Sequence, residues 1–84
     1  MNKIQLRSKA KALEPILRIG KNGLAENVIK EISSLLKEKK LIKIKLLKSS
    51  LDNKNKKELI KEIAGKTDSE LIEAVGNIAV LYRK

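Results

Sequence analysis

The chain is predicted to fold as an α/β domain of the two-layer α+β type, because helical and strand patterns alternate along it in the order α-β-α-β-α-β-β. Strand–helix–strand steps of this kind favour a mixed sheet with helices packed on one or both faces. The 13 Leu, 11 Ile and 3 Val side chains suffice for one small aliphatic core. Because no linker, repeat or low-complexity segment interrupts the pattern, we expect a single domain spanning residues 1–84.

The first predicted helix covers residues 4–13, where apolar side chains recur at i, i+4 and i+7. Its apolar face consists of Leu6, Ala10 and Leu13. Pro15 disfavours helical geometry at the residue before it, so the helix should stop by then and a short strand should follow at residues 16–19. Residues 20–23, with the sequence Gly-Lys-Asn-Gly, are a turn by composition.

A longer apolar stripe with helical spacing follows the turn and predicts the second helix. The stripe consists of Leu24, Val28, Ile32, Leu35 and Leu36. Asn22 is a candidate N-cap, and Glu26 in the first turn suits the positive end of the helix dipole. Residues 41–46 then alternate with period two, which predicts a half-buried strand. Its outer face carries Lys43 and Lys45, which we expect to point to the open face of the sheet.

The last third of the chain predicts one more helix and a β-hairpin. The apolar face of the helix consists of Leu59, Ile60, Ile63 and Ala64. Gly65 is expected to end this helix as its C′ residue. Residues 70–75 predict a short strand, and the Gly76-Asn77 pair is the two-residue turn of a hairpin. The closing strand, residues 78–83, is apolar on both faces, so we expect it at a central position in the sheet.

The charge of the chain is strongly basic and unevenly distributed. Twenty Lys and Arg against ten Asp and Glu give a formal net charge of +10. Residues 1–57 hold 16 basic and 5 acidic groups, a net of +11, whereas residues 58–84 hold 4 basic and 5 acidic groups, a net of −1. A bias towards Lys in the whole composition explains Lys over Arg, but it does not explain this distribution. A polyanionic partner, and nucleic acid in particular, is therefore favoured.

The residue types that are missing narrow the chemistry. Without Cys or His the chain has no disulfide framework, thiol nucleophile or zinc ribbon, and it lacks the usual general base at neutral pH. We therefore expect no enzyme activity, no metal site and no cofactor. The apolar runs are far shorter than the ~20 residues that span a bilayer, and the basic N-terminal segment shows no export signal. A cytoplasmic protein without membrane contact is expected, and the short chain without a heptad favours a monomer.

Gly20 and Gly23 form a Gly-x-x-Gly (GxxG) motif between a predicted strand and a predicted helix. Glycines permit unusual backbone turns and remove Cβ atoms that would keep phosphates away, while N–H groups at the following helix start point at the anion. Lys21 adds charge inside the loop, and Arg18 precedes it. An ordinary strand-to-helix turn is the structural alternative. KH domains clamp nucleic-acid backbone with a loop of this type, and the basic context here favours that use.

Six short segments carry a more specific signal. They are residues 6–10 (LRSKA), 13–15 (LEP), 19–24 (IGKNGL), 41–45 (LIKIK), and 75–76 (VG) with 80–83 (VLYR). In this order and spacing they resemble the YhbY family, the bacterial stand-alone form of the CRM domain. The resemblance implies a domain similar to the C-terminal domain of translation initiation factor three, with helices packed on a four-stranded mixed sheet. It also implies RNA binding through the GxxG loop and an association with precursors of the large ribosomal subunit.

The resemblance also supplies candidate RNA contacts position by position. These candidates are Gly20, Lys21, Asn22 and Gly23 in the loop, together with Lys9 and Arg83. The chain departs from the family pattern at Ala25, where members often carry a hydroxyl residue that caps the helix. It departs again at Asn77, where members often carry a Lys that would contact phosphate.

We therefore expect a non-catalytic protein that binds ribosomal RNA and assists assembly of the large subunit, with Arg18, Lys43 and Lys45 as additional contacts. Tyr82 is the only aromatic residue and is expected to anchor the sheet, so backbone contact should dominate over base stacking. The alternatives are a nonspecific DNA-binding or architectural protein and a ribosome-associated protein–protein adaptor. Preference for duplex DNA over RNA would indicate the first, and binding that survives high salt would indicate the second.

Overall fold

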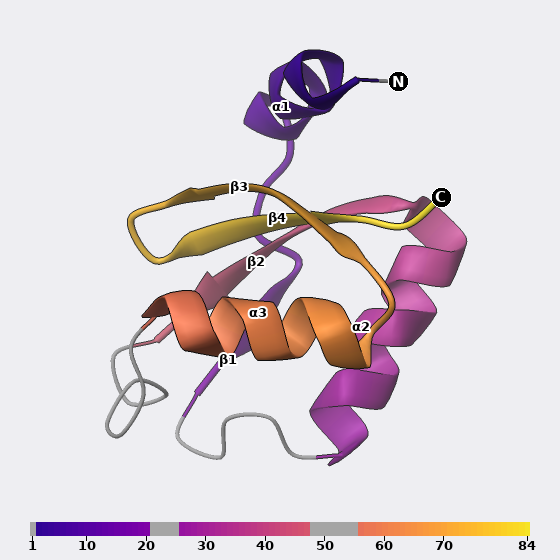
Figure 1. The fold of residues 1–84 in the computed structure, drawn as a ribbon, viewed down its shortest axis with the longest axis vertical. Coiled ribbons are helices and arrows are strands. Elements are labelled where there is room, and N and C mark those ends of the chain that lie inside the picture. Colours follow the sequence, from indigo (N-terminus) through magenta and orange to yellow (C-terminus); the bar gives the residue numbers. More distant parts are fainter. Residues whose placement is uncertain (1, 21–25, 48–55) are drawn as a thin grey trace.

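A mixed sheet with the strand order β1-β2-β4-β3 organises the structure, a computed structural model that describes residues 2–20, 26–47 and 56–84 (Figure 1). β1 pairs parallel with β2, and the other two strand pairs are antiparallel. The described elements, in chain order, are α1 (Lys3–Lys11), β1 (Leu17–Ile19), α2 (Glu26–Lys39), β2 (Leu41–Leu46), α3 (Lys56–Lys66), β3 (Glu70–Val75) and β4 (Ile78–Tyr82). This order and the four-stranded mixed sheet confirm the predicted fold class.

Helices lie on both faces of the sheet, with α1 above it and α2 and α3 below it in the view of Figure 1. The main core fills the space between the sheet and the α2–α3 pair. Its buried members are Ile19, Ile32, Leu36, Ile42, Ile44, Leu46, Leu59, Ile60, Ile63, Ala79 and Leu81. The sheet and these two helices form the two principal layers, and α1 covers part of the remaining face.

The predicted alternation in β2 is confirmed. Ile42, Ile44 and Leu46 are at most 2% exposed, whereas Lys43 and Lys45 between them are only half-buried. The predicted central position of the closing strand is also confirmed, because β4 lies between β2 and β3. A central strand with helices on both sides has apolar neighbours on both faces, which explains the run of buried residues that does not alternate there.

Helix α1 begins with a capping box in which the Asn2 side chain accepts from the backbone N–H of Gln5 at 2.9 Å and the Gln5 side chain accepts from the backbone N–H of Asn2. Leu6 and Ala10 are buried as predicted. The prediction that Leu13 shares their face is wrong: the helix ends at Lys11, and the Leu13 side chain is 38% exposed in the following segment.

The prediction that Gly65 ends the third helix is also wrong, because α3 continues to Lys66. Asp68 takes the left-handed conformation instead, with a φ of 51°, and the N–H of Ser69 donates to the carbonyl of Ala64 at 3.0 Å. This is a Schellman ending, displaced three residues from the glycine. The hydroxyl of buried Thr67 stabilises it by donating to the carbonyl of Ile63 at 2.7 Å.

The β3–β4 hairpin contains a bulge that shapes the α1 side of the sheet. The register shifts between Leu71 and Glu73, so that Ile72 and Glu73 both lie on the face that α1 covers. Gly76 opens the two-residue turn with a φ of 58°, where a two-residue hairpin accepts glycine readily. In the described parts of the chain, no helix has both the length and the apolar character needed to cross a membrane.

Candidate nucleic-acid interface

The face of the sheet opposite α2 and α3 carries three of the predicted contact residues. Lys43 and Lys45 alternate with the core-facing residues of β2, so they lie on this face. Arg18 alternates in the same way in β1, and the parallel register places it directly beside Lys45. Neighbouring strands are about 4.8 Å apart, so the two cationic side chains leave the sheet side by side.

Helix α1 covers only one part of this face. It packs through Leu6 and Ala10 on a small cluster with Ile72 and Val80, to which Leu41 and Tyr82 are attached. Two ion pairs flank the cluster: Lys3 to Glu70 at 3.7 Å, and Arg7 to Glu73 at 4.0 Å. The next row across the sheet joins Arg18, Lys45, Ile78 and Val75, and none of its members belongs to the cluster. This row, which we call the basic row, is therefore the part of the sheet face that α1 leaves open.

Lys43 lies at the border between the covered and open parts. Its ammonium group donates to the backbone carbonyl of Leu13 at 3.1 Å, in the segment that connects α1 to β1. This bond holds the amino group at a fixed place near the end of α1. Lys11, in the last turn of α1, borders the same hollow as Lys43. Sequence reasoning did not single out Lys11 because its neighbourhood depends on where α1 packs.

The GxxG loop lies at the end of β1, and only its first residue belongs to the described part of the chain. Gly20 is half-buried, and a Cβ added there would meet Leu47 Cδ1 at an ordinary 3.6 Å. Packing therefore does not require glycine at this position. The predicted roles of Lys21, Asn22 and Gly23 fall outside the described residues, as do the predicted N-cap and the first residue of the apolar stripe.

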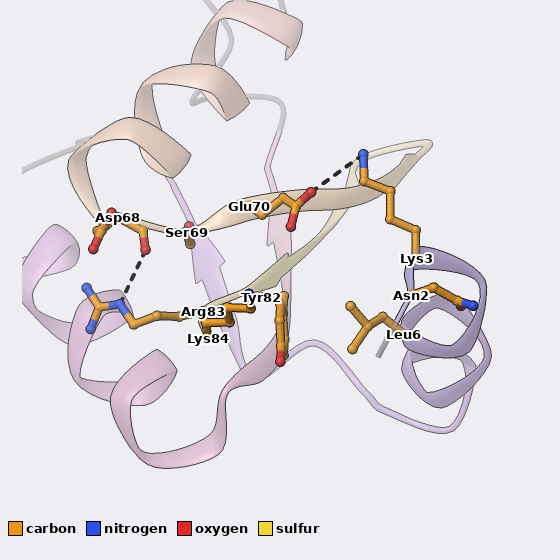
Figure 2. A pocket seen from close by; sticks show the side chains of 9 residues that line it. All are labelled: Asn2, Lys3, Leu6, Asp68, Ser69, Glu70, Tyr82, Arg83 and Lys84. Atoms are coloured by element: carbon orange, nitrogen blue, oxygen red, sulfur yellow. Dashed lines mark hydrogen bonds and ion pairs between the residues drawn. The ribbon is translucent and has the colours of Figure 1, made fainter.

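Arg83 is engaged by the protein itself. Its guanidinium group donates to the carbonyl of Thr67 at 2.6 Å and to the hydroxyl of Ser33 at 3.1 Å. Longer contacts of 3.4 Å reach the carbonyls of Ser33 and Asp68, and Figure 2 shows the side chain extended towards the latter. The predicted RNA contact at Arg83 would have to use a side chain that already joins α2 and the end of α3. The other predicted contact, Lys9, is exposed on α1.

A pocket of about 540 Å³ lies beside the end of β4, between α1 and the loop after α3 (Figure 2). Tyr82 and Leu6 line it from the sheet and from α1, and both belong to the small cluster under α1. Tyr82 is thus packed as an anchor of the sheet face, in agreement with the prediction. The charged lining of the pocket is mixed, with the carboxylates of Asp68 and Glu70 beside the cations of Lys3, Arg83 and Lys84.

Nothing in the described ranges suggests a metal centre, because they contain no group of three metal-ligating His, Cys, Asp or Glu side chains. The glutamates that recur at helical spacing serve as surface ion pairs where their partners are described. Glu26 pairs with Lys30 at 3.5 Å, and Glu62 pairs with Lys66 at 3.9 Å. Both pairs lie on the surface of their helices.

Comparisons with known proteins agree with the geometry. The chain is 42% identical over 81 residues to "Probable RNA-binding protein MJ0652" of Methanocaldococcus jannaschii; the match covers 96% of this chain and 60% of that longer protein. It is 37% identical to "Probable RNA-binding protein YqeI" of Bacillus subtilis, over 94% of this chain and 80% of that one. The solution structure of SAV1595 from Staphylococcus aureus superposes with a TM-score of 0.79 at 41% identity, over 98% of this chain and 83% of that one. Residues 1–83 match the CRS1 / YhbY (CRM) domain, and the chain belongs to that family.

Proposed function

We propose that this protein binds ribosomal RNA in precursors of the large ribosomal subunit and assists their assembly, without catalysing a reaction. It acts as a cytoplasmic monomer that grips the RNA backbone. The observation that carries the proposal is the pairing of Arg18 with Lys45 on the uncovered row of the sheet, immediately before the GxxG loop. Relatives named as probable RNA-binding proteins support the RNA-binding part of the proposal.

The electrostatics of the row suit a phosphate backbone. Within the described residues, neither Arg18 nor Lys45 forms an ion pair, and Lys43 donates only to a neutral carbonyl. Like charges held on neighbouring strands repel one another, and a bound polyanion relieves that repulsion. Release of counterions from the RNA then supplies a binding free energy that depends on salt and not on sequence.

The sheet face is tested by removing two charges from it. The variant Arg18→Gln/Lys45→Gln should bind a ribosomal RNA fragment about tenfold more weakly, and the negative slope of log K against log salt should decrease in magnitude by about 1.4–1.8. The matched control, Lys37→Gln/Lys61→Gln, removes the same charge from exposed positions on α2 and α3. Equal losses in the two variants would mean that only net charge matters, and the sheet face would be excluded as the interface.

The loop is tested separately. Replacing Lys21 and Asn22 by Asp should weaken RNA binding roughly tenfold or more while the melting temperature holds, because two negative charges then stand where phosphate should lie. Unchanged affinity in a fluorescence assay would remove the loop from the mechanism.

The identity of the RNA needs an experiment in cells. Crosslinking the protein in vivo and sequencing the attached RNA should recover large-subunit ribosomal RNA, and gradient sedimentation should place the protein with immature large subunits. A scatter of reads over messenger RNAs would contradict the assembly role. Preference for duplex DNA in competition, or binding that is insensitive to salt, would favour the architectural or adaptor alternative instead.

A further inference from the structure

An apolar hollow lies at the border between the part of the sheet face that α1 covers and the open row. Its volume is about 310 Å³. The lining residues are Lys11, Lys43, Glu73, Val75, Ile78 and Val80. Three aliphatic side chains from β3 and β4 form the apolar part, and the charged side chains come from α1, β2 and β3. Val75 is 62% exposed, so a large aliphatic surface faces solvent at this place.

The fold creates this hollow through the placement of α1. The helix packs on Val80 but ends at Lys11, before it reaches the row that joins Lys45, Ile78 and Val75. Ile78 therefore lies between Lys45 on β2 and the exposed Val75 on β3. It does not belong to the cluster on which α1 packs. An apolar floor beside the Lys43 ammonium group offers both apolar and electrostatic contacts within one site.

The charges that line the hollow are mainly cationic, because Lys11 and Lys43 both border it. The Lys43 ammonium group is held by the carbonyl of Leu13, and Lys45 and Arg18 continue the cationic side along the sheet. Glu73 is the one carboxylate among the lining residues, and it is paired to Arg7 at 4.0 Å. A ligand with an anionic end and a flat, weakly polar end would place its anion on the lysine side and its flat end over the aliphatic floor.

The geometry points to a binding site for a single unpaired nucleotide of RNA, with its base on Val75 and Ile78, against the edge of the mostly buried Val80, and its phosphate on Lys43 and Lys45. This inference rests on the proposed function and makes it more specific. The volume is near the lower end of the ~300–1,000 Å³ typical of small-ligand clefts, which suits one nucleotide and not a longer segment. A base within a duplex is stacked and paired, so only a bulged, looped or terminal base reaches an aliphatic floor of this kind.

The apolar floor of the hollow is tested with substitutions to Thr, which keep the charge of the protein. Val75→Thr removes apolar surface at nearly constant shape, and we expect about fivefold weaker binding of a short single-stranded oligoribonucleotide. Binding of the duplex formed with its complement should change less than twofold. Ile4→Thr is the matched control, because Ile4 is 74% exposed on α1 and does not line the hollow. This control should leave both affinities unchanged.

NMR on the wild-type protein locates the contact directly. Methyl resonances of Val75, Ile78 and Val80 should shift on titration with the single strand and much less with the duplex. Equal shifts with both RNAs, or no methyl shift while Arg18→Gln/Lys45→Gln still weakens binding, would overturn the nucleotide site and leave the RNA interface standing. Shifts caused only by an aspartate-rich peptide would overturn it in favour of a protein partner. Failure of the wild-type protein to bind any RNA would overturn both proposals.

Discussion

Arg83 gives the sharpest test of whether a predicted RNA contact is instead a structural residue. Its guanidinium group makes two well-formed hydrogen bonds, at 2.6 Å to Thr67 and at 3.1 Å to Ser33, and two long ones of 3.4 Å. The carbonyls of Thr67 and Asp68 lie at the C-terminal end of α3, where a cation also complements the helix dipole. The side chain thereby joins α2 and α3 to the end of the sheet.

The expected loss of folding stability on replacing Arg83 follows from those hydrogen bonds. A hydrogen bond to a charged group contributes about 1.5–3 kcal/mol when buried, and the long contacts add little. The site is only partly buried, so water can replace part of what is lost, and we take about 2 kcal/mol for Arg83→Met. For a domain of this size the melting temperature should then fall by roughly 8–16 °C. Arg83→Lys keeps the charge, but its shorter side chain ends before the Nη2 position that makes both good hydrogen bonds, so it should recover less than half of the loss.

The assay combines thermal unfolding, followed by circular dichroism, with RNA affinity measured well below the transition. Lys84→Met is the matched control, because it removes the neighbouring charge from an exposed position. We expect Arg83→Met to lose stability and to retain RNA affinity within about twofold of the control. A melting temperature within about 2 °C of wild type, together with a lower RNA affinity and a smaller salt slope, would refute the structural role and establish Arg83 as a phosphate contact.

Three further substitutions test the packing. Leu6→Ala removes the main anchor of α1, and urea unfolding should show a loss of about 2–3 kcal/mol; a loss under 1 kcal/mol would mean that α1 contributes little to the fold. Gly65→Ala lies inside α3 with nothing within 4 Å, so it should stabilise the protein by about 0.5–1 kcal/mol. Gly76→Ala should do the opposite, by about 1–2 kcal/mol, because the φ of 58° disfavours a side chain. Changes of the same sign at both glycines would contradict the assigned helix end and turn.

The elements that sequence predicts well are those whose surroundings are uniform along their length. β2 has the α2–α3 core on one side throughout, so its alternating residues translate directly into alternating burial. α2 likewise packs on that core through Ile32 and Leu36, which the apolar stripe identified. In both cases the regular spacing of apolar residues is enough to predict which of them are buried, because the element packs on the same core along its length.

The errors occur where distant residues decide the local structure. Gly65 is the best local candidate for a helix end, yet α3 continues because Asp68 adopts the left-handed conformation and Thr67 is buried beneath it. Arg83, which is 16 residues from Thr67 and 50 from Ser33, holds this ending. Contacts between residues so far apart in the chain leave no periodic pattern in the sequence. The hollow beside β4 was missed for a similar reason, since it requires the strand order and the point where α1 stops.

The position of α1 shows where part of the chain's unevenly distributed charge is offset. The acidic groups of the nearly neutral last third include Glu70 and Glu73, and these lie opposite Lys3 and Arg7 of α1. Both ion pairs are long and exposed, so each contributes little to stability. Their main effect is on the distribution of charge. The two glutamates offset part of the positive charge of α1 over the covered part of the sheet. On this face of the sheet, the described cations that form no ion pair are then Arg18 and Lys45 on the open row and Lys43 at its border, and a backbone of phosphates would be attracted there.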